Sequence, residues 1–121
     1  MERNKGRSGQ GSVRRAVRII AAVVNPEGRD PGSETVTLVN TGRSAATLER
    51  WSINDKNGRA HLITGVTLVA GAFHTLELKG NTAQLSNKGG EIVLKDDREA
   101  LVHRVTYSKA QARSQGVTIL F

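Results

Sequence analysis

The amino-acid sequence predicts an all-β domain, built as a sandwich or a barrel. From Ala16 onward the apolar residues recur mainly at every second position, as in strands that bury one face. Val, Ile and Thr dominate these runs, and their branched side chains favour extended backbone. Turn-forming residues separate the runs at intervals of about 8–12 residues, which is typical of short antiparallel strands.

The first strand is predicted over residues 17–23. Arg18 is expected on its exposed face, and a loop that contains both prolines of the chain follows at residues 25–33. The residues expected on the buried face are Val17, Ile19, Ala21 and Val23.

The remaining strands follow from the same alternation. They are predicted at residues 34–40, 46–48, 51–53, 61–63, 66–69, 73–78, 91–95, 101–107 and 117–121. Trp51 is in phase with Ile53, and Tyr107 with Val105, so both aromatic side chains are expected in the core. The turns between the strands include Asn87, Gly89 and Gly90, which are interpreted as structural.

One short helix is predicted near the C-terminus, at residues 109–115. Ser108 and Gln111 have the spacing of a capping box, and Gly116 stands where a C-terminal glycine cap is expected. The residues after Gly116 return to strand composition and are expected to pair into the sheet.

Positive charge is concentrated at the start of the chain. Residues 1–15 contain five Lys and Arg against one Glu, and they hold +4 of a formal net charge of +7. With few apolar side chains, this segment is expected to be a disordered arm, and residues 16–121 a single domain. Arg14, Arg15 and Arg18 are the candidate contacts for nucleic acid or an acidic partner. A solvated leader with no binding role is the favoured alternative.

The sequence contains no motif of an enzyme, metal site or cofactor site. Of the three histidines, His74 and His103 alternate with apolar residues, so a core or rim position is favoured over a catalytic one. His61 is the third. The chain has no Cys, and HExxH, G-x-S-x-G and the glycine motifs that bind phosphate are absent. Catalysis, a bound metal, a cofactor and a small-molecule substrate are therefore not expected.

Several segments, in order, carry a resemblance to a known family. They are an E-x-V-x-L-x-N strand at residues 34–40, a segment ending in Trp51, a turn at residues 67–71, an L-x-N-x-G strand at residues 85–96 and a closing V-x-Y at Tyr107. Over about residues 17–107 the chain resembles the lamin tail domain, including its bacterial members. Arg50 stands where the family often has Gly, and Ala70 where it often has Pro.

The resemblance implies an immunoglobulin-like β-sandwich without catalytic residues. In animals such domains end filament proteins and are associated with binding proteins and DNA, and in bacteria they accompany hydrolase or nuclease domains. Residues 1–16 contain no heptad repeat, so filament formation is not expected here.

The function predicted is therefore that of a non-catalytic interaction module. It is expected to bind a protein partner, or a second copy of itself, through its sheet edges. The alternative is weak, sequence-independent binding of nucleic acid through the basic N-terminal region. The longest apolar run, Ile19 to Val24, is far shorter than a membrane helix requires, and no signal sequence is visible, so a cytoplasmic protein is expected.

Overall fold

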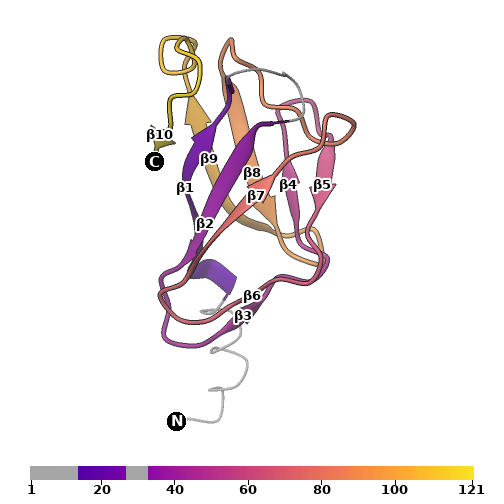
Figure 1. The fold of residues 1–121 in the computed structure, drawn as a ribbon. Helices are drawn as coiled ribbons and strands as arrows, with labels where there is room; N and C mark the ends of the chain where they lie inside the picture. Colours follow the sequence, from indigo (N-terminus) through magenta and orange to yellow (C-terminus); the bar gives the residue numbers. More distant parts are fainter. Residues whose placement is uncertain (1–13, 27–32) are drawn as a thin grey trace.

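The computed structural model describes residues 14–26 and 33–121, and it confirms the all-β prediction (Figure 1). Two four-stranded sheets and one two-stranded sheet have the strand orders β10-β1-β2-β7, β5-β4-β8-β9 and β3-β6. The first five strands are β1 (Val17–Val23), β2 (Thr35–Asn40), β3 (Ala46–Thr47), β4 (Ser52–Asn54) and β5 (Ala60–Leu62). The others are β6 (Thr67–Leu68), β7 (Phe73–Glu77), β8 (Gly90–Lys95), β9 (Leu101–Tyr107) and β10 (Ile119–Leu120).

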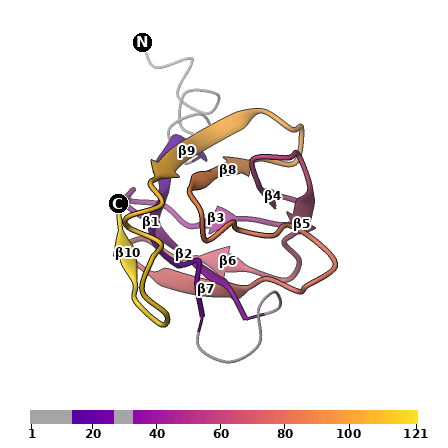
Figure 2. The ribbon, with the colours of Figure 1, turned by 90° about the horizontal axis from the view of Figure 1, so that it is seen from above.

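The two larger sheets face each other and enclose the core. Seen from above, their strands surround the interior, and β1 of one sheet lies beside β9 of the other (Figure 2). Trp51, which the strand phase assigns to the interior, is 2% exposed, and Tyr107 is also buried. The largest fully buried apolar side chains are Ile19, Leu38, Leu48, Ile53, Ile63, Leu78, Ile92 and Leu94. The described residues contain no helix with the length and hydrophobicity needed for a membrane span.

A bulge in β1 changes the face on which its later residues lie. Ile19 pairs with Leu38 and Ala21 with Thr37, so Ile20 is an extra residue between them. Beyond this point the alternation shifts by one position, and Ala22 becomes buried while Val23 is only half-buried. The prediction that Val23 shares the buried face of β1 is therefore wrong.

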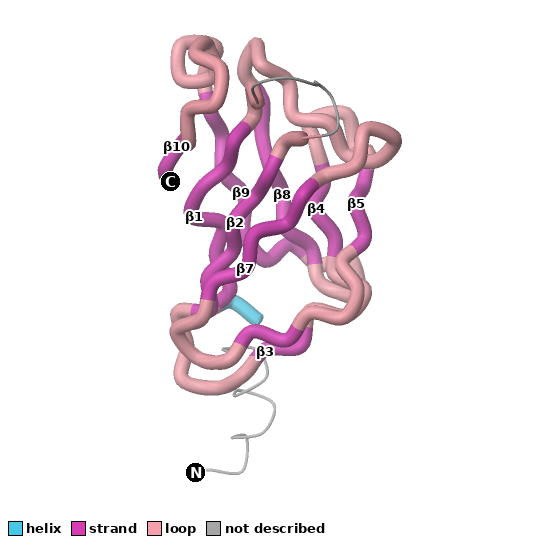
Figure 3. The backbone as a smooth tube through the Cα atoms, viewed as in Figure 1, coloured by secondary structure: helices cyan, strands magenta, loops and turns pink. Residues whose placement is uncertain are grey.

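The helix predicted at residues 109–115 is also wrong, because this segment is a series of turns (Figure 3). The capping bonds themselves form: the Ser108 N–H donates to Gln111 Oε1 at 2.8 Å, and the Gln111 N–H donates to Ser108 Oγ at 3.1 Å. The helical ladder does not continue, however: the Arg113 N–H donates to Ala110 O, only three residues back, at 3.4 Å, and the Gly116 N–H donates to Asn25 O at 2.7 Å. The carbonyls of Ala112 and Arg113 accept the Asn25 side-chain amide at 3.0 and 3.1 Å. The chain then reaches β10, which pairs with β1 as expected.

Candidate binding surfaces

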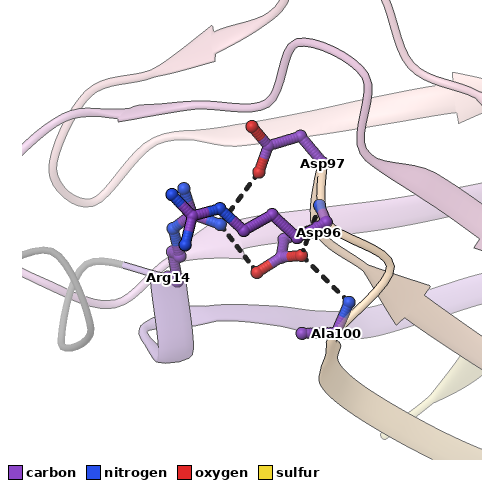
Figure 4. A network of polar contacts seen from close by, with 5 residues as sticks. Arg14, Asp96, Asp97 and Ala100 are labelled. Atoms are coloured by element: carbon purple, nitrogen blue, oxygen red, sulfur yellow. Dashed lines mark hydrogen bonds and ion pairs between the residues drawn. The ribbon is translucent and has the colours of Figure 1, made fainter.

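The first candidate site, at Arg14, is an ion-paired contact between the start of the domain and the turn from β8 to β9. Arg14 and Arg15 have helical backbone directly before β1. The Arg14 guanidinium donates to Asp96 Oδ2 at 2.7 Å and to Asp97 Oδ1 at 2.9 Å (Figure 4). Its charge is therefore balanced by two carboxylates.

Asp96 organises the same turn from inside. Its Oδ1 accepts the backbone N–H groups of Arg98 at 2.9 Å and Ala100 at 3.0 Å. Burial by itself raises the pKa of this carboxyl, but the hydrogen bonds from Ala100, Arg98 and Arg14 outweigh it and hold the pKa below its ordinary value. The carboxylate is thus a structural ion, and Arg14 is one of its partners.

The predicted cluster of three arginines is divided by this arrangement. Arg14 is committed to the two aspartates, whereas Arg15 and Arg18 are exposed. Arg18 projects from β1 at the position paired with Val39 of β2. The predicted disordered arm falls, up to residue 13, outside the described residues.

The three histidines lie apart, and each is half-buried. His61 Nδ1 lies 3.3 Å from Thr82 Oγ1, and His74 belongs to β7. His103 Nδ1 accepts the Ile19 N–H at 2.9 Å, which ties β9 to the bulge of β1 and requires an unprotonated Nδ1. Burial, followed by the charge of Arg18, lowers the pKa of His103. Among the described residues, no three His, Cys or acidic side chains form a group that could hold a metal ion.

The second candidate surface is the edge formed by β7. This strand is the outermost member of its sheet and pairs only with β2. The Leu78 N–H donates to Glu34 O, so Leu78, Leu76 and His74 alternate as the positions that bond to β2. The backbone N–H and C=O groups of Phe73, Thr75 and Glu77 consequently point away from β2, toward the open edge.

Apolar side chains stand beside this edge. Phe73 is 67% exposed and Val69 is 60% exposed. A turn joins them, because the Ala72 N–H donates to Val69 O at 3.0 Å. The strand alternation alone predicts Phe73 as a strand residue without indicating this exposure.

The third candidate surface lies at the end of the sandwich where the β4–β5, β7–β8 and β9–β10 connections meet (Figure 1). Gly89 has a φ of 102°, and a Cβ there would lie 3.1 Å from Lys109 N. Lys56 Nζ lies 3.4 Å from Gly89 O, and Tyr107 Oη donates to Ser86 O at 2.6 Å. The turn that contains Asn87, Gly89 and Gly90 is therefore packed against both neighbouring segments.

Two open pockets flank this turn. One, of about 620 Å³, is lined by Asn25, Asn87, Lys88, Lys109, Ala110 and Arg113. The other, of about 370 Å³, has Lys56, Arg59 and Lys88 on its lining together with Glu34, Asn57 and Ser86. Lys88 thus belongs to both. The sequence alone does not indicate this site, because its cations are far apart in the chain.

Comparison with protein families settles the relationship that the strand motifs suggest. The family described as Lamin Tail Domain matches residues 10–109, which include β1 to β9. The chain belongs to this family. The expected resemblance is confirmed, and the all-β sandwich agrees with the fold of lamin tail domains.

Lamin tail domains are in general non-catalytic. A search of curated proteins found none that matches the chain. Arg50, where the family often has Gly, has a φ of 67°, a left-handed conformation that glycine adopts most readily.

Proposed function

We propose that this lamin tail domain is a non-catalytic interaction module that binds an extended polypeptide segment along edge strand β7. The observation that carries the proposal is the register of β7 on β2. It leaves three residues, Phe73, Thr75 and Glu77, with backbone donors and acceptors directed outward. A strand that pairs with them extends the sheet, and each added backbone hydrogen bond contributes about 0.5–1.5 kcal/mol.

The other edges are shorter or covered. β10 has two residues and β5 has three, whereas β7 has five. β9 lies against β1, where His103 accepts the Ile19 N–H. The exposed pair Val69 and Phe73 offers an apolar anchor beside β7, which suits a partner strand with one apolar face.

A second copy of the chain is the simplest partner, and its pairing is tested by sedimentation equilibrium. We expect concentration-dependent dimerisation that Thr75→Pro abolishes, because proline removes the outward N–H at the centre of β7. Thr75→Val is the matched control: it loses the hydroxyl that lies 2.9 Å from Thr37 Oγ1 but keeps the N–H. This control is expected to dimerise.

A different partner protein is tested by site-specific photo-crosslinking in cells. A photoreactive residue at position 73 is expected to give a discrete adduct that Thr75→Pro removes. The same residue at Leu62, which is 57% exposed on the β5 edge, is expected not to give it. A strictly monomeric chain together with identical adducts from both positions would refute binding at β7.

The nucleic-acid alternative is a second proposal, now carried by Arg15 and Arg18. Both are exposed in the described residues, whereas Arg14 is balanced by Asp96 and Asp97. Titration against duplex DNA at two salt concentrations tests it, since binding through phosphate contacts weakens steeply with salt. Arg15→Gln with Arg18→Gln is expected to reduce binding more than Arg14→Gln does. Equal effects, or no binding at low salt, would exclude this surface.

A further inference from the structure

Five cations converge at one end of the sandwich from segments far apart in the sequence. Lys56 and Arg59 belong to the β4–β5 turn, Lys88 to the turn before β8, and Lys109 and Arg113 to the segment after β9. All five are exposed, and the described residues form no ion pair with any of them. We refer to these five residues as the loop-end cations.

The backbone beneath the loop-end cations is tightly held. The Asp55 carboxylate accepts the N–H groups of Asn57 at 2.8 Å, Arg59 at 2.9 Å and Gln84 at 2.9 Å. This carboxylate is buried inside its turn, and its hydrogen bonds fasten the β4–β5 turn to the segment before β8. The cations therefore project from connected, ordered turns.

The two pockets differ in charge. Lys88, Lys109 and Arg113 line the larger pocket, and the described residues around it include no carboxylate. The smaller pocket has Lys56, Arg59 and Lys88, but Glu34 also lines it, with 1% exposure. Cavities lined by one sign of charge concentrate the field and attract the opposite ion. The larger pocket is therefore the stronger anion site, and Lys88 links it to the smaller one.

The chemistry of the lining indicates phosphate. Lys and Arg side chains donate charge-assisted hydrogen bonds to phosphate oxygens, and Asn57 adds an amide group to the smaller pocket. The amide of Asn25, in the larger pocket, donates to the carbonyls of Ala112 and Arg113 instead. The described lining includes no aromatic side chain, so nothing there favours stacking of nucleic-acid bases. A ligand held here is recognised through its phosphates.

We propose that the loop-end cations bind a small ligand that carries two or more linked phosphate groups, with one phosphate in each pocket and Lys88 between them. This site is separate from β7, because it uses side chains of the loops and no strand edge. The failure of the phosphate-binding proposal can therefore be told apart from the failure of the polypeptide-binding proposal. Thr75→Pro changes β7 but leaves the loop-end cations in place.

Isothermal titration calorimetry of the full chain with tripolyphosphate tests the proposal. We expect saturable binding, weaker binding of orthophosphate and a loss of affinity with added salt. The double variant Lys88→Gln with Arg113→Gln is expected to lower the affinity for tripolyphosphate by at least about tenfold, because it loses charge-assisted hydrogen bonds. The control, Arg43→Gln with Arg98→Gln, removes the same charge from the β2–β3 and β8–β9 loops at the opposite end and is expected to change affinity less than about twofold (Figure 1).

Three outcomes would overturn the proposal. They are absence of tripolyphosphate binding at low salt, equal losses in the two double variants, and binding of a single-stranded oligonucleotide through these residues without binding of tripolyphosphate. The last result would identify a nucleic-acid surface instead. Circular dichroism and the urea midpoint of each variant distinguish a lost site from a lost fold.

Discussion

Removal of the Asp96 carboxylate is expected to destabilise the domain far more than removal of the arginine paired with it. Asp96 is 6% exposed, and its Oδ1 accepts two backbone N–H groups while Oδ2 accepts Arg14. A hydrogen bond to a charged group contributes about 1.5–3 kcal/mol. The two backbone bonds alone therefore predict that Asp96→Ala lowers the free energy of unfolding by at least about 3 kcal/mol.

The Arg14 ion pair contributes much less to this loss. The Arg14 side chain is 32% exposed, and ion pairs that solvent reaches contribute about 0–1 kcal/mol. Arg14→Gln is therefore expected to lower the free energy of unfolding by less than about 1 kcal/mol. Urea denaturation followed by tryptophan fluorescence measures both variants, because Trp51 is buried and is the single Trp of the chain.

The stabilisation by Asp96 is also expected to depend on pH. Because the pKa of Asp96 is lowered in the folded protein, its stabilisation is present above the ordinary value of 3.8 and is lost as the pH falls further. The difference between the wild type and Asp96→Ala should therefore shrink in acid. Equal losses for Asp96→Ala and Arg14→Gln at neutral pH would refute the assignment of the stabilisation to the backbone bonds.

Three further predictions concern the strained turns, the core and β1. Arg50→Gly and Glu99→Gly should each raise the free energy of unfolding in urea by about 0.5 kcal/mol, because both residues have positive φ values, 67° and 63°. Trp51→Ala should lower it by about 3–5 kcal/mol, and an unchanged urea midpoint would contradict its place in the core. Because the folded-state pKa of His103 is lowered, stability should fall as the pH drops below the ordinary 6.5, and His103→Gln should show a smaller fall.

The alternation of apolar residues was enough to predict the strands, but the bulge at Ile20 was not visible in it. The bulge depends on groups distant in the chain: His103, 84 residues away from Ile19, accepts its N–H, and the Phe121 N–H donates to Ile20 O at 2.9 Å. A local pattern carries no information about such partners. The helix prediction fails for the same kind of reason, since the Gly116 N–H, which a helix would direct to Ala112 O, donates instead to the distant Asn25 O at 2.7 Å.

The loop-end cations cannot be predicted from the sequence for a related reason, which a comparison of two equivalent turns shows. In the β4–β5 turn Asp55 Oδ1 accepts two backbone N–H groups, and in the β8–β9 turn Asp96 Oδ1 does the same at the same spacing. The sequence identifies both as turns.

Their surroundings, however, give the two turns opposite electrostatic roles. At Asp96 the carboxylate also binds Arg14, and Asp97 takes part, so two negative charges offset the positive charge of Arg14. At Asp55 the third hydrogen bond comes instead from the neutral Gln84 N–H, and the neighbouring Lys56 and Arg59 face the Lys88 turn. The same local motif is therefore part of an ion-paired contact at one end of the sandwich and stands among exposed cations at the other. The density of arginines in the N-terminal segment pointed to the first end, whereas in the described part of the chain five exposed cations gather at the second.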